Sequence, residues 1–357
     1  MDRRDFLKTT GSAAATAGAA ASVTSVQAQD NSQTGQKLPT SPNLARLGVR
    51  DLSYGMTAPD NGRGVGDSSR RLARRIESLT GGRFRLHVVT GAAAADAGLR
   101  HGSANDDVNA NPAFAYFAGL PGPHGLAAND LDAWIAIGGG QMLWDDLAAA
   151  HGFKPFLAGH TGANPAIWSR YPLTQTSAFQ GLKFAAHGLA NDVARGLGAV
   201  PVAVAAEELA LALTDGRLDA SEGPGAMHSL AEGLAEAAPF ALSEGINRAG
   251  TAQSLSVKST LWQSLSAADQ AAIAAAAAEE FRLSHAEARA HEALAWNVMR
   301  DRYKVAVSPA PAELADAIDR MSGAVVAHVA GANRIAQRIN ASFMAFRAML
   351  PGPSIIS

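Results

Sequence analysis

An uninterrupted run of helix-forming residues near the C-terminus constrains the fold more than any other feature. From Ser266 to Lys304 the chain is rich in alanine and contains neither glycine nor proline, which indicates a continuous helix. Ser266 followed by Asp269 is typical of a helix N-cap. About 38 residues at about 1.5 Å each would make a helix of roughly 57 Å. That length exceeds the diameter of one small lobe, so we expect the helix to span two lobes.

The preceding sequence alternates between strand and helix patterns. A strand at Leu52–Met56, a helix over 68–79 ended by Gly81-Gly82, and a strand at Phe84–Val89 are expected first. This order predicts a mostly parallel sheet with crossover helices, hence an α/β fold. Further strands are expected at 153–158, 166–169, 181–185, 201–204 and from 218, and further helices at 131–151 (broken at 138–140), 191–197, 206–214 and from Pro311 to 349.

The N-terminus has the pattern of an export signal. Arg3-Arg4, followed by Phe6-Leu7-Lys8, resembles a twin-arginine motif, and a mildly apolar stretch and a small-x-small pattern ending at Ala28 follow it. We predict a signal peptide over 1–28 and, because 29–46 is polar, a flexible leader there. No other long apolar run occurs, so we expect a soluble periplasmic protein.

Composition excludes several classes of function. The formal net charge is -2 and 17% of residues are charged, so no basic excess points to a nucleic-acid partner. The absence of cysteine excludes thiolate metal sites, disulfides and cysteine nucleophiles. The sequence has no Gly-x-Ser-x-Gly or His-Glu-x-x-His motif. We therefore expect that the protein is not an enzyme. Acid–base chemistry by Glu222, His187 and the Asp106–Asp107 pair remains a less favoured alternative.

Four sequence blocks carry a resemblance to a known family. Three of them are Asn111–Phe117, Trp134 with Gly138–Gly140, and Ala158–Ala163 with Trp168. The fourth is the most specific and runs from Gly181-Leu182-Lys183 to Asp219–Glu222. It consists of glycines, Pro201-Val202 and acidic residues at kept spacing. The chain resembles the DctP-type solute receptors of TRAP transporters and is most similar to the subgroup that binds 2-oxo acids.

The resemblance implies a two-lobed periplasmic solute-binding-protein fold with mixed sheets, hinge strands and a long lobe-spanning helix. It implies a receptor that captures a small organic solute, organic or 2-oxo acids being the precedent, and delivers it to the membrane subunits of a TRAP permease. Whether the receptor is a monomer or a dimer is left open. We place lobe I at 47–163 plus about 250–265, lobe II at 164–249, the long helix at 266–304 and C-terminal helices at 305–357.

The sequence departs from this family at the positions that hold the ligand. The arginine that clamps the carboxylate of the ligand is replaced by Ala185, and the nearest alternatives in sequence are Lys183 and His187. Such a loss matters because a guanidinium offers two parallel donors. We therefore leave the identity of the ligand open, together with the alternative of a receptor-fold protein with altered or lost binding that acts as a sensor or accessory protein.

The metal site implied by the 2-oxo-acid subgroup is also altered. Its glutamine falls on Asn164, its first glutamate is kept as Glu222, its tryptophan is Gly223, and its second glutamate falls on Arg248 or, with a gap, on Glu244. Glu222 remains the one candidate ligand for Na⁺ or Ca²⁺. A cation about 4 Å from Arg248 would be repelled by a few kcal/mol, which disfavours the metal, and Arg248 could instead lie beside Glu222 in its place.

The aromatic wall of the family site is replaced by polar residues. Asn105, Asp106 and Asp107 stand there, and if both aspartates face the cleft they favour a cationic or polyhydroxylated ligand. Trp168 either stacks on the ligand or packs in the core. The expected ligand-binding positions are Asn105, Asp106, Asp107, Asn164, Trp168, Ala185, Glu222, Gly223 and Arg248.

Overall fold

A computed structural model describes residues 48–58, 64–163 and 166–350. All of them belong to one unit, Thr40–Ser357. The predicted signal peptide (1–28) and leader (29–46) lie outside the described residues. In the described part of the chain, no helix is both long enough and apolar enough to cross a membrane.

The first sheet has five strands in the order β2-β1-β3-β10-β4. Strand β1 (Arg50–Met56) runs parallel to β2 (Phe84–Val89) and β3 (Leu99–Ser103), while β10 (Ala252–Lys258) is antiparallel to both β3 and β4 (Phe153–His160). Helices α3 (Gly64–Leu79) and α4 (Ala92–Ala95) make the crossovers. The predicted strand–helix–strand opening is confirmed, and β3 and β10 are additional strands that were not predicted.

The second sheet has six short strands in the order β11-β9-β5-β8-β6-β7. Only β5 is antiparallel to its neighbours, β8 and β9. The predicted strand at 201–204 is shorter than expected and forms only β7. The bounds are β5 (Ile167–Ser169), β6 (Lys183–Ala185), β7 (Val200–Pro201), β8 (Ala220–Glu222), β9 (Phe240–Leu242) and β11 (Ala306–Ser308).

The strands support the predicted lobe boundaries, which stay a prediction. Every strand of the first sheet lies within 50–160 or 252–258. One difference concerns 305–357, where only helices were expected, from Pro311 to 349. Its segment Ala306–Ser308 forms strand β11, because it pairs in parallel with β9, Ala306 opposite Phe240.

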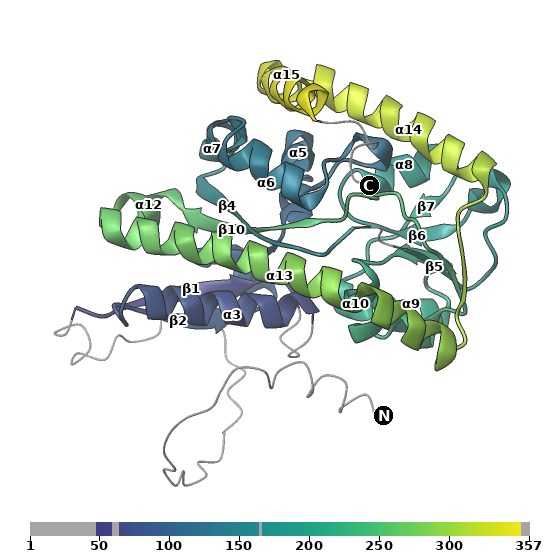
Figure 1. Cartoon of the computed structure of the whole chain (residues 1–357), viewed down its shortest axis with the longest axis horizontal. Coiled ribbons are helices and arrows are strands. Elements are labelled where there is room, and N and C mark those ends of the chain that lie inside the picture. The colour runs from purple at the N-terminus through teal and green to yellow at the C-terminus, as the bar shows by residue number, and fades with distance from the viewer. Residues whose placement is uncertain (1–47, 59–63, 164–165, 351–357) are drawn as a thin grey trace, which may run out of the picture. The chain divides into compact units, whose positions relative to one another are not determined.

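The long helix α13 (Ala267–Asp301) has 35 residues and packs on the cores of both sheets (Figure 1). The Ser266 hydroxyl accepts a hydrogen bond from the Asp269 N–H, as the capping pattern predicts. Ile273 belongs to the apolar core of the first sheet and Met299 to a core beside the second. The helix ends three residues before the predicted Lys304, whose positive φ of 59° is incompatible with a continuing right-handed helix.

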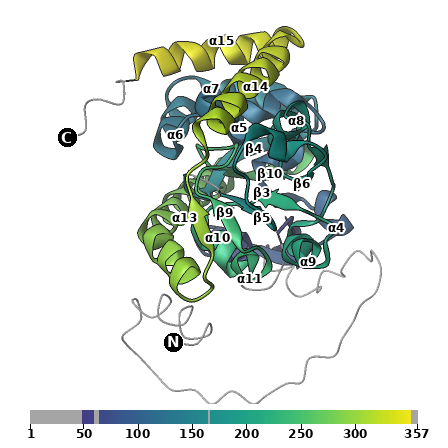
Figure 2. The ribbon, with the colours of Figure 1, turned by 90° about the vertical axis from the view of Figure 1, so that its right-hand side faces the viewer.

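The remaining helices lie on both sides of the sheets. α14 (Ala312–Gly331) and α15 (Arg334–Met349) lie on the same side as α6 (Ala128–Ala136) and α7 (Gly140–Ala149), opposite α9 and α11 (Figure 2). The predicted break between α6 and α7 is confirmed at Gly139, whose φ is 87°. The other helices are α5 (Ala115–Ala118), α8 (Ala190–Gly196), α9 (Leu209–Asp215), α10 (Ala226–Ala231), α11 (Leu234–Ala237) and α12 (Ser259–Gln263).

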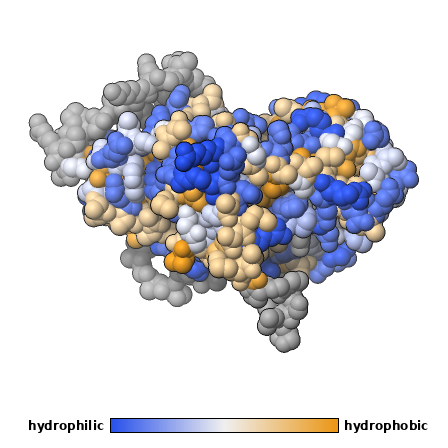
Figure 3. Space-filling model, turned by 90° about the horizontal axis from the view of Figure 1, so that it is seen from above, coloured by the Kyte–Doolittle hydropathy of each residue, from blue (hydrophilic) through white to orange (hydrophobic). Residues whose placement is uncertain are grey.

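An aromatic core holds the α5–α7 region to the C-terminal helices. Phe117 stacks on Trp134 and Trp144 at centroid distances of 5.1 and 4.9 Å, and Trp134 meets Phe343 of α15 edge-on. The outer face that carries α14 and α15 mixes hydrophilic and hydrophobic residues without one continuous apolar surface (Figure 3). Single exposed apolar side chains of this kind are ordinary on a folded protein.

Candidate ligand-binding site

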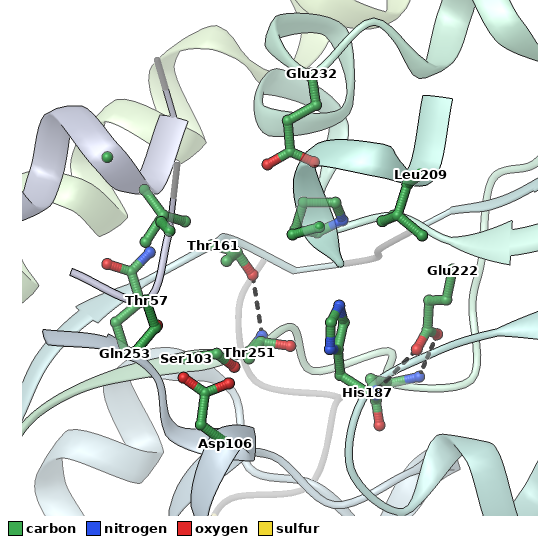
Figure 4. A pocket seen from close by; sticks show the side chains of 17 residues that line it. Thr57, Ser103, Asp106, Thr161, His187, Leu209, Glu222, Glu232, Thr251 and Gln253 are labelled. Atoms are coloured by element: carbon green, nitrogen blue, oxygen red, sulfur yellow. Dashed lines mark hydrogen bonds between the residues drawn. The ribbon is translucent and has the colours of Figure 1, made fainter. Parts of the chain in front are cut away.

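A cavity of about 110 Å³ is lined by residues that follow strands of both sheets (Figure 4). The first sheet contributes Thr57 after β1 and Ser103 at the end of β3. The second contributes Glu222 at the end of β8. The complete lining is Thr57, Ala58, Val65, Gly66, Ser103, Asp106, Thr161, His187, Ala206, Leu209, Glu222, Gly223, Pro224, Glu232, Asn247, Thr251 and Gln253.

The two segments that connect the sheets also reach this cavity. Thr161 follows β4, and Thr251 precedes β10. The Thr161 N–H donates to the Thr251 carbonyl at 3.0 Å, and the Thr251 N–H donates to Thr161 Oγ1 at 3.0 Å. These bonds join the two chain crossings, so a change in the angle between the sheets would act on the cavity directly.

Glu222 is a buried carboxyl group held by Asn247. Its two oxygens accept hydrogen bonds from the Asn247 N–H and Nδ2, each at 2.8 Å. Burial raises the pKa of Glu222 to about 7, and the donors of Asn247 and Ile246 oppose this rise. The group is therefore poised to change charge near neutral pH.

Glu232, at the C-terminal end of α10, faces the cavity from another side (Figure 4). Among the described residues no atom makes a hydrogen bond with its carboxyl group. Burial raises its pKa to about 8, because removal from water disfavours the charged form. Sequence reasoning missed Glu232, since nothing in the local pattern distinguishes it from a solvated helix-end glutamate.

The pKa values of Asp106 and His187, which both line the cavity, are shifted in opposite directions. Asp106 and His187 are both exposed to solvent in the described chain. Desolvation inside the cavity nevertheless raises the pKa of Asp106, although Thr57, His187 and Arg100 oppose the rise. Desolvation lowers the pKa of His187 against the opposing effect of Asp106, so its imidazole is neutral near pH 7. Asp106 lies in a short 3-10 turn whose N-cap, Ser103, accepts from the Asn105 N–H.

Gln253, in β10, is a further cavity residue that the sequence did not reveal. Its side chain is 1% exposed, and its Oε1 lies 3.3 Å from the Ser68 hydroxyl, while no described atom accepts from its Nε2. Turning the amide over would exchange the two atoms, so one polar atom of Gln253 lacks a protein partner in either orientation. Buried groups of this kind need a partner, which makes Gln253 a candidate ligand contact.

The predicted site residues divide into three groups. Asp106, Glu222 and Gly223 line the cavity, and Asn164 lies outside the described residues. The others do not line it, and the structure gives each another environment: Asn105 is buried behind Gly188, Asp107 bonds to Arg100 at 2.5 Å, Trp168 stacks on Trp296, Ala185 packs in an apolar core and Arg248 pairs with Asp319 at 2.9 Å.

Two of these placements have clear physical reasons. Trp168 is fully buried and donates from Nε1 to the Ser229 hydroxyl at 3.2 Å, so it packs in the core, as one of the two expected alternatives had it. One interpretation of the sequence placed Arg248 beside Glu222, in place of a metal ion. Its guanidinium lies against Asp319 of α14 instead, and the neighbouring Asn247 satisfies Glu222.

The family and a curated relative match a large part of the chain. Residues 123–330 match the profile of DctP, bacterial extracellular solute-binding protein family 7. A monocarboxylate 2-oxoacid-binding periplasmic protein of Nostoc sp. is 27% identical over 239 residues, which are 63% of this chain and 65% of that protein. The match therefore spans slightly less than two thirds of that relative.

Solved structures of TRAP solute-binding proteins share the fold. One from Bordetella bronchiseptica, with copurified calcium and picolinate, has a TM-score of 0.79 and 24% identity over 84% of this chain and 92% of its own. One from Colwellia psychrerythraea, with calcium and pyruvate, has a TM-score of 0.77 and 20% identity over 84% and 94%. One from Pseudoalteromonas atlantica, with sodium and pyruvate, has a TM-score of 0.78 and 21% identity over 84% and 94%. These likenesses confirm the predicted two-lobed α/β fold.

Proposed function

Because the chain belongs to the DctP family of bacterial extracellular solute-binding proteins, we propose that it is a periplasmic receptor that captures a small organic solute and delivers it to a TRAP permease. The observation that carries this proposal is the cavity between elements of the two sheets, with polar groups converging on it. Family and fold are those of solute-binding receptors.

Capture follows from where the lining residues are attached. Asp106 follows a strand of the first sheet, and His187 and Glu222 follow strands of the second. A solute that contacts both sets favours the arrangement in which the lobes are close together, and its loss favours opening. The crossings at Thr161 and Thr251 would be the hinge of this movement.

The relatives supply precedents for location and ligand. The Nostoc relative is named as a periplasmic protein that binds monocarboxylate 2-oxoacids, and the proposed twin-arginine signal over 1–28 would bring this chain to the same compartment. The described residues form a cavity lined by polar groups. This cavity gives no support to the alternative, a receptor-fold protein that has lost ligand binding.

Three similar structures hold calcium or sodium together with their ligand, so we asked whether this site could bind a metal ion. In the part of the chain that the structure describes, no three His, Asp or Glu side chains are placed to hold an ion. Glu222, the proposed metal ligand, directs both oxygens to Asn247. The described residues, which do not include Asn164, do not fit an ion of the kind seen in the relatives, and we route no step of capture through one.

The test is native mass spectrometry of the full chain purified from its own host, followed by thermal-shift measurements with organic acids, sugars and amines. A receptor should carry a small molecule that is lost on unfolding, and the same molecule should raise the melting temperature when it is added back. Protein that carries nothing and responds to no compound would contradict the proposal.

A further inference from the structure

The cavity is lined by three carboxyl groups and by no lysine or arginine among the described residues. Asp106, Glu222 and Glu232 approach it from different elements, and His187 lies between them (Figure 4). Since His187 is neutral near pH 7, nothing in the described lining would balance these carboxylates when they ionise. A carboxylate ligand would be repelled by each of these three groups that is ionised.

The described basic side chains that lie close in sequence to the cavity residues interact with other groups. Arg100 donates to Asp107 at 2.5 Å, and Arg248 pairs with Asp319 at 2.9 Å. Lys183 donates to the Gly216 carbonyl. Ala185, where the resemblance places a guanidinium, packs among apolar residues of the second lobe. Among the described residues, the cavity lining therefore has no guanidinium or ammonium group that would bind a carboxylate.

Two groups at the cavity, the partly buried Glu232 and the fully buried Gln253, have polar atoms without protein partners among the described residues, and each points to a ligand. The Glu232 carboxyl group has no hydrogen bond among the described residues, and one polar atom of the Gln253 amide has none either. Each would be satisfied by a complementary group of a bound molecule: a cationic donor at Glu232 and a hydroxyl, which can donate or accept, at Gln253.

The apolar residues of the lining indicate which class of organic cation the cavity could bind. It consists of small and aliphatic residues such as Val65, Ala206 and Leu209, and the described lining contains no phenylalanine, tyrosine or tryptophan. Quaternary ammonium groups are bound by aromatic faces. Ammonium groups that keep N–H donors are bound by carboxylates through charge-assisted hydrogen bonds.

We propose that this receptor binds a small polar molecule with a primary or secondary ammonium group and a hydroxyl group, and not a free carboxylic acid. The ammonium group faces Glu232 and Asp106, and the hydroxyl group reaches Gln253. This inference rests on the proposed receptor function, and it assigns to the ligand the positive charge that calcium or sodium brings to the structures of similar fold.

The experiment is isothermal titration calorimetry of the full chain with ethanolamine, 3-aminopropanol and putrescine. Choline serves as the methylated control, and pyruvate and 2-oxobutyrate are titrated with and without calcium chloride. We expect saturable binding of at least one N–H-bearing ammonium compound, at least tenfold weaker binding of choline, and no binding of either oxo acid.

Two variants test the assignment of the ammonium site. Glu232→Gln and Asp106→Asn keep the shape but remove the carboxyl group that would ionise beside the ammonium group, and each should weaken ammonium binding by about tenfold, the difference between a charged and a neutral hydrogen bond. Glu244→Gln, which changes an exposed carboxylate outside the cavity, should leave it unchanged. Circular dichroism melting shows that each variant is folded.

The outcomes separate the two proposals. Binding of an oxo acid, alone or with calcium, without ammonium binding would overturn this inference and leave the receptor function intact. Ammonium binding that Glu232→Gln and Asp106→Asn do not weaken would also overturn it. Failure of every compound, with no molecule copurified from the host, would overturn the inference and the receptor function together.

Discussion

Asn247 binds Glu222 with both of its donors, the backbone N–H to Oε1 and the side-chain amide to Oε2, each at 2.8 Å. Glu222 ends a strand of the second sheet, and Asn247 lies in the segment that leads to β10 of the first. The pair therefore ties the crossing between the sheets to the wall of the cavity.

Asn247→Ala should destabilise the protein, because it leaves a buried carboxyl oxygen without its donor. The cost should be about 1–3 kcal/mol, measured as the free energy of unfolding in urea. It should be larger at pH 8 than at pH 5, because the pKa of Glu222 is about 7 and the amide supports the ionised form. Equal costs at both pH values would contradict this role. Asn297→Ala, at an exposed position of α13, is the control.

Arg71 should be the most important charged residue between α3 and α13. It contacts Glu280, whose side chain is 2% exposed, at 2.6 Å and Glu287 at 2.8 Å. Arg71→Met would leave Glu280 buried without its cation, at a cost of about 3–5 kcal/mol. Arg75→Met breaks a more exposed pair with Glu279 and should cost at most about 1 kcal/mol. Similar urea midpoints for the two variants would contradict the prediction.

Gly223 should resist substitution. A Cβ there would collide with Ser229 Oγ and would lie 2.6 Å from Trp168 Nε1, the two atoms that share a hydrogen bond of 3.2 Å. Gly223→Ala should lower the free energy of unfolding by about 1–3 kcal/mol and change the fluorescence of Trp168. Gly331→Ala, where a Cβ meets no atom within 4 Å, should be neutral or stabilising. Unaltered stability of Gly223→Ala would show that the Trp168–Ser229 contact yields easily.

Glu232 should make the unliganded protein less stable as pH rises. Its pKa is about 8 in the folded protein and about 4.3 in an unfolded chain. Between these values the folded protein holds a proton that the unfolded chain has released, so stability falls as pH rises from about 5 to 8. Glu232→Gln should remove part of this slope and be more stable than the unchanged protein at pH 9. A slope that is the same in both proteins would refute the assignment.

The family resemblance and the local patterns predicted a large share of the fold. The helix cap at Ser266, the break at Gly139 and the opening strand–helix–strand unit were all predicted correctly, because each depends on residues a few positions apart. The strands β3, β9, β10 and β11 were not predicted. β3, β9 and β11 are three to five residues long. Their pairing depends on distant segments: β11 pairs with β9, 66 positions away in register, and β9 also pairs with β5.

The sequence by itself determined that a long helix must serve two lobes, since an alanine-rich run without glycine or proline has few alternatives to a helix. Only the tertiary structure decided the composition of the cavity. It brought Glu232 and Gln253 to the same space as Asp106 and turned Arg248 toward Asp319. The reason is that helix formation depends on residues close together in the sequence. The pairing and desolvation of a charged group depend instead on which distant segments pack around it.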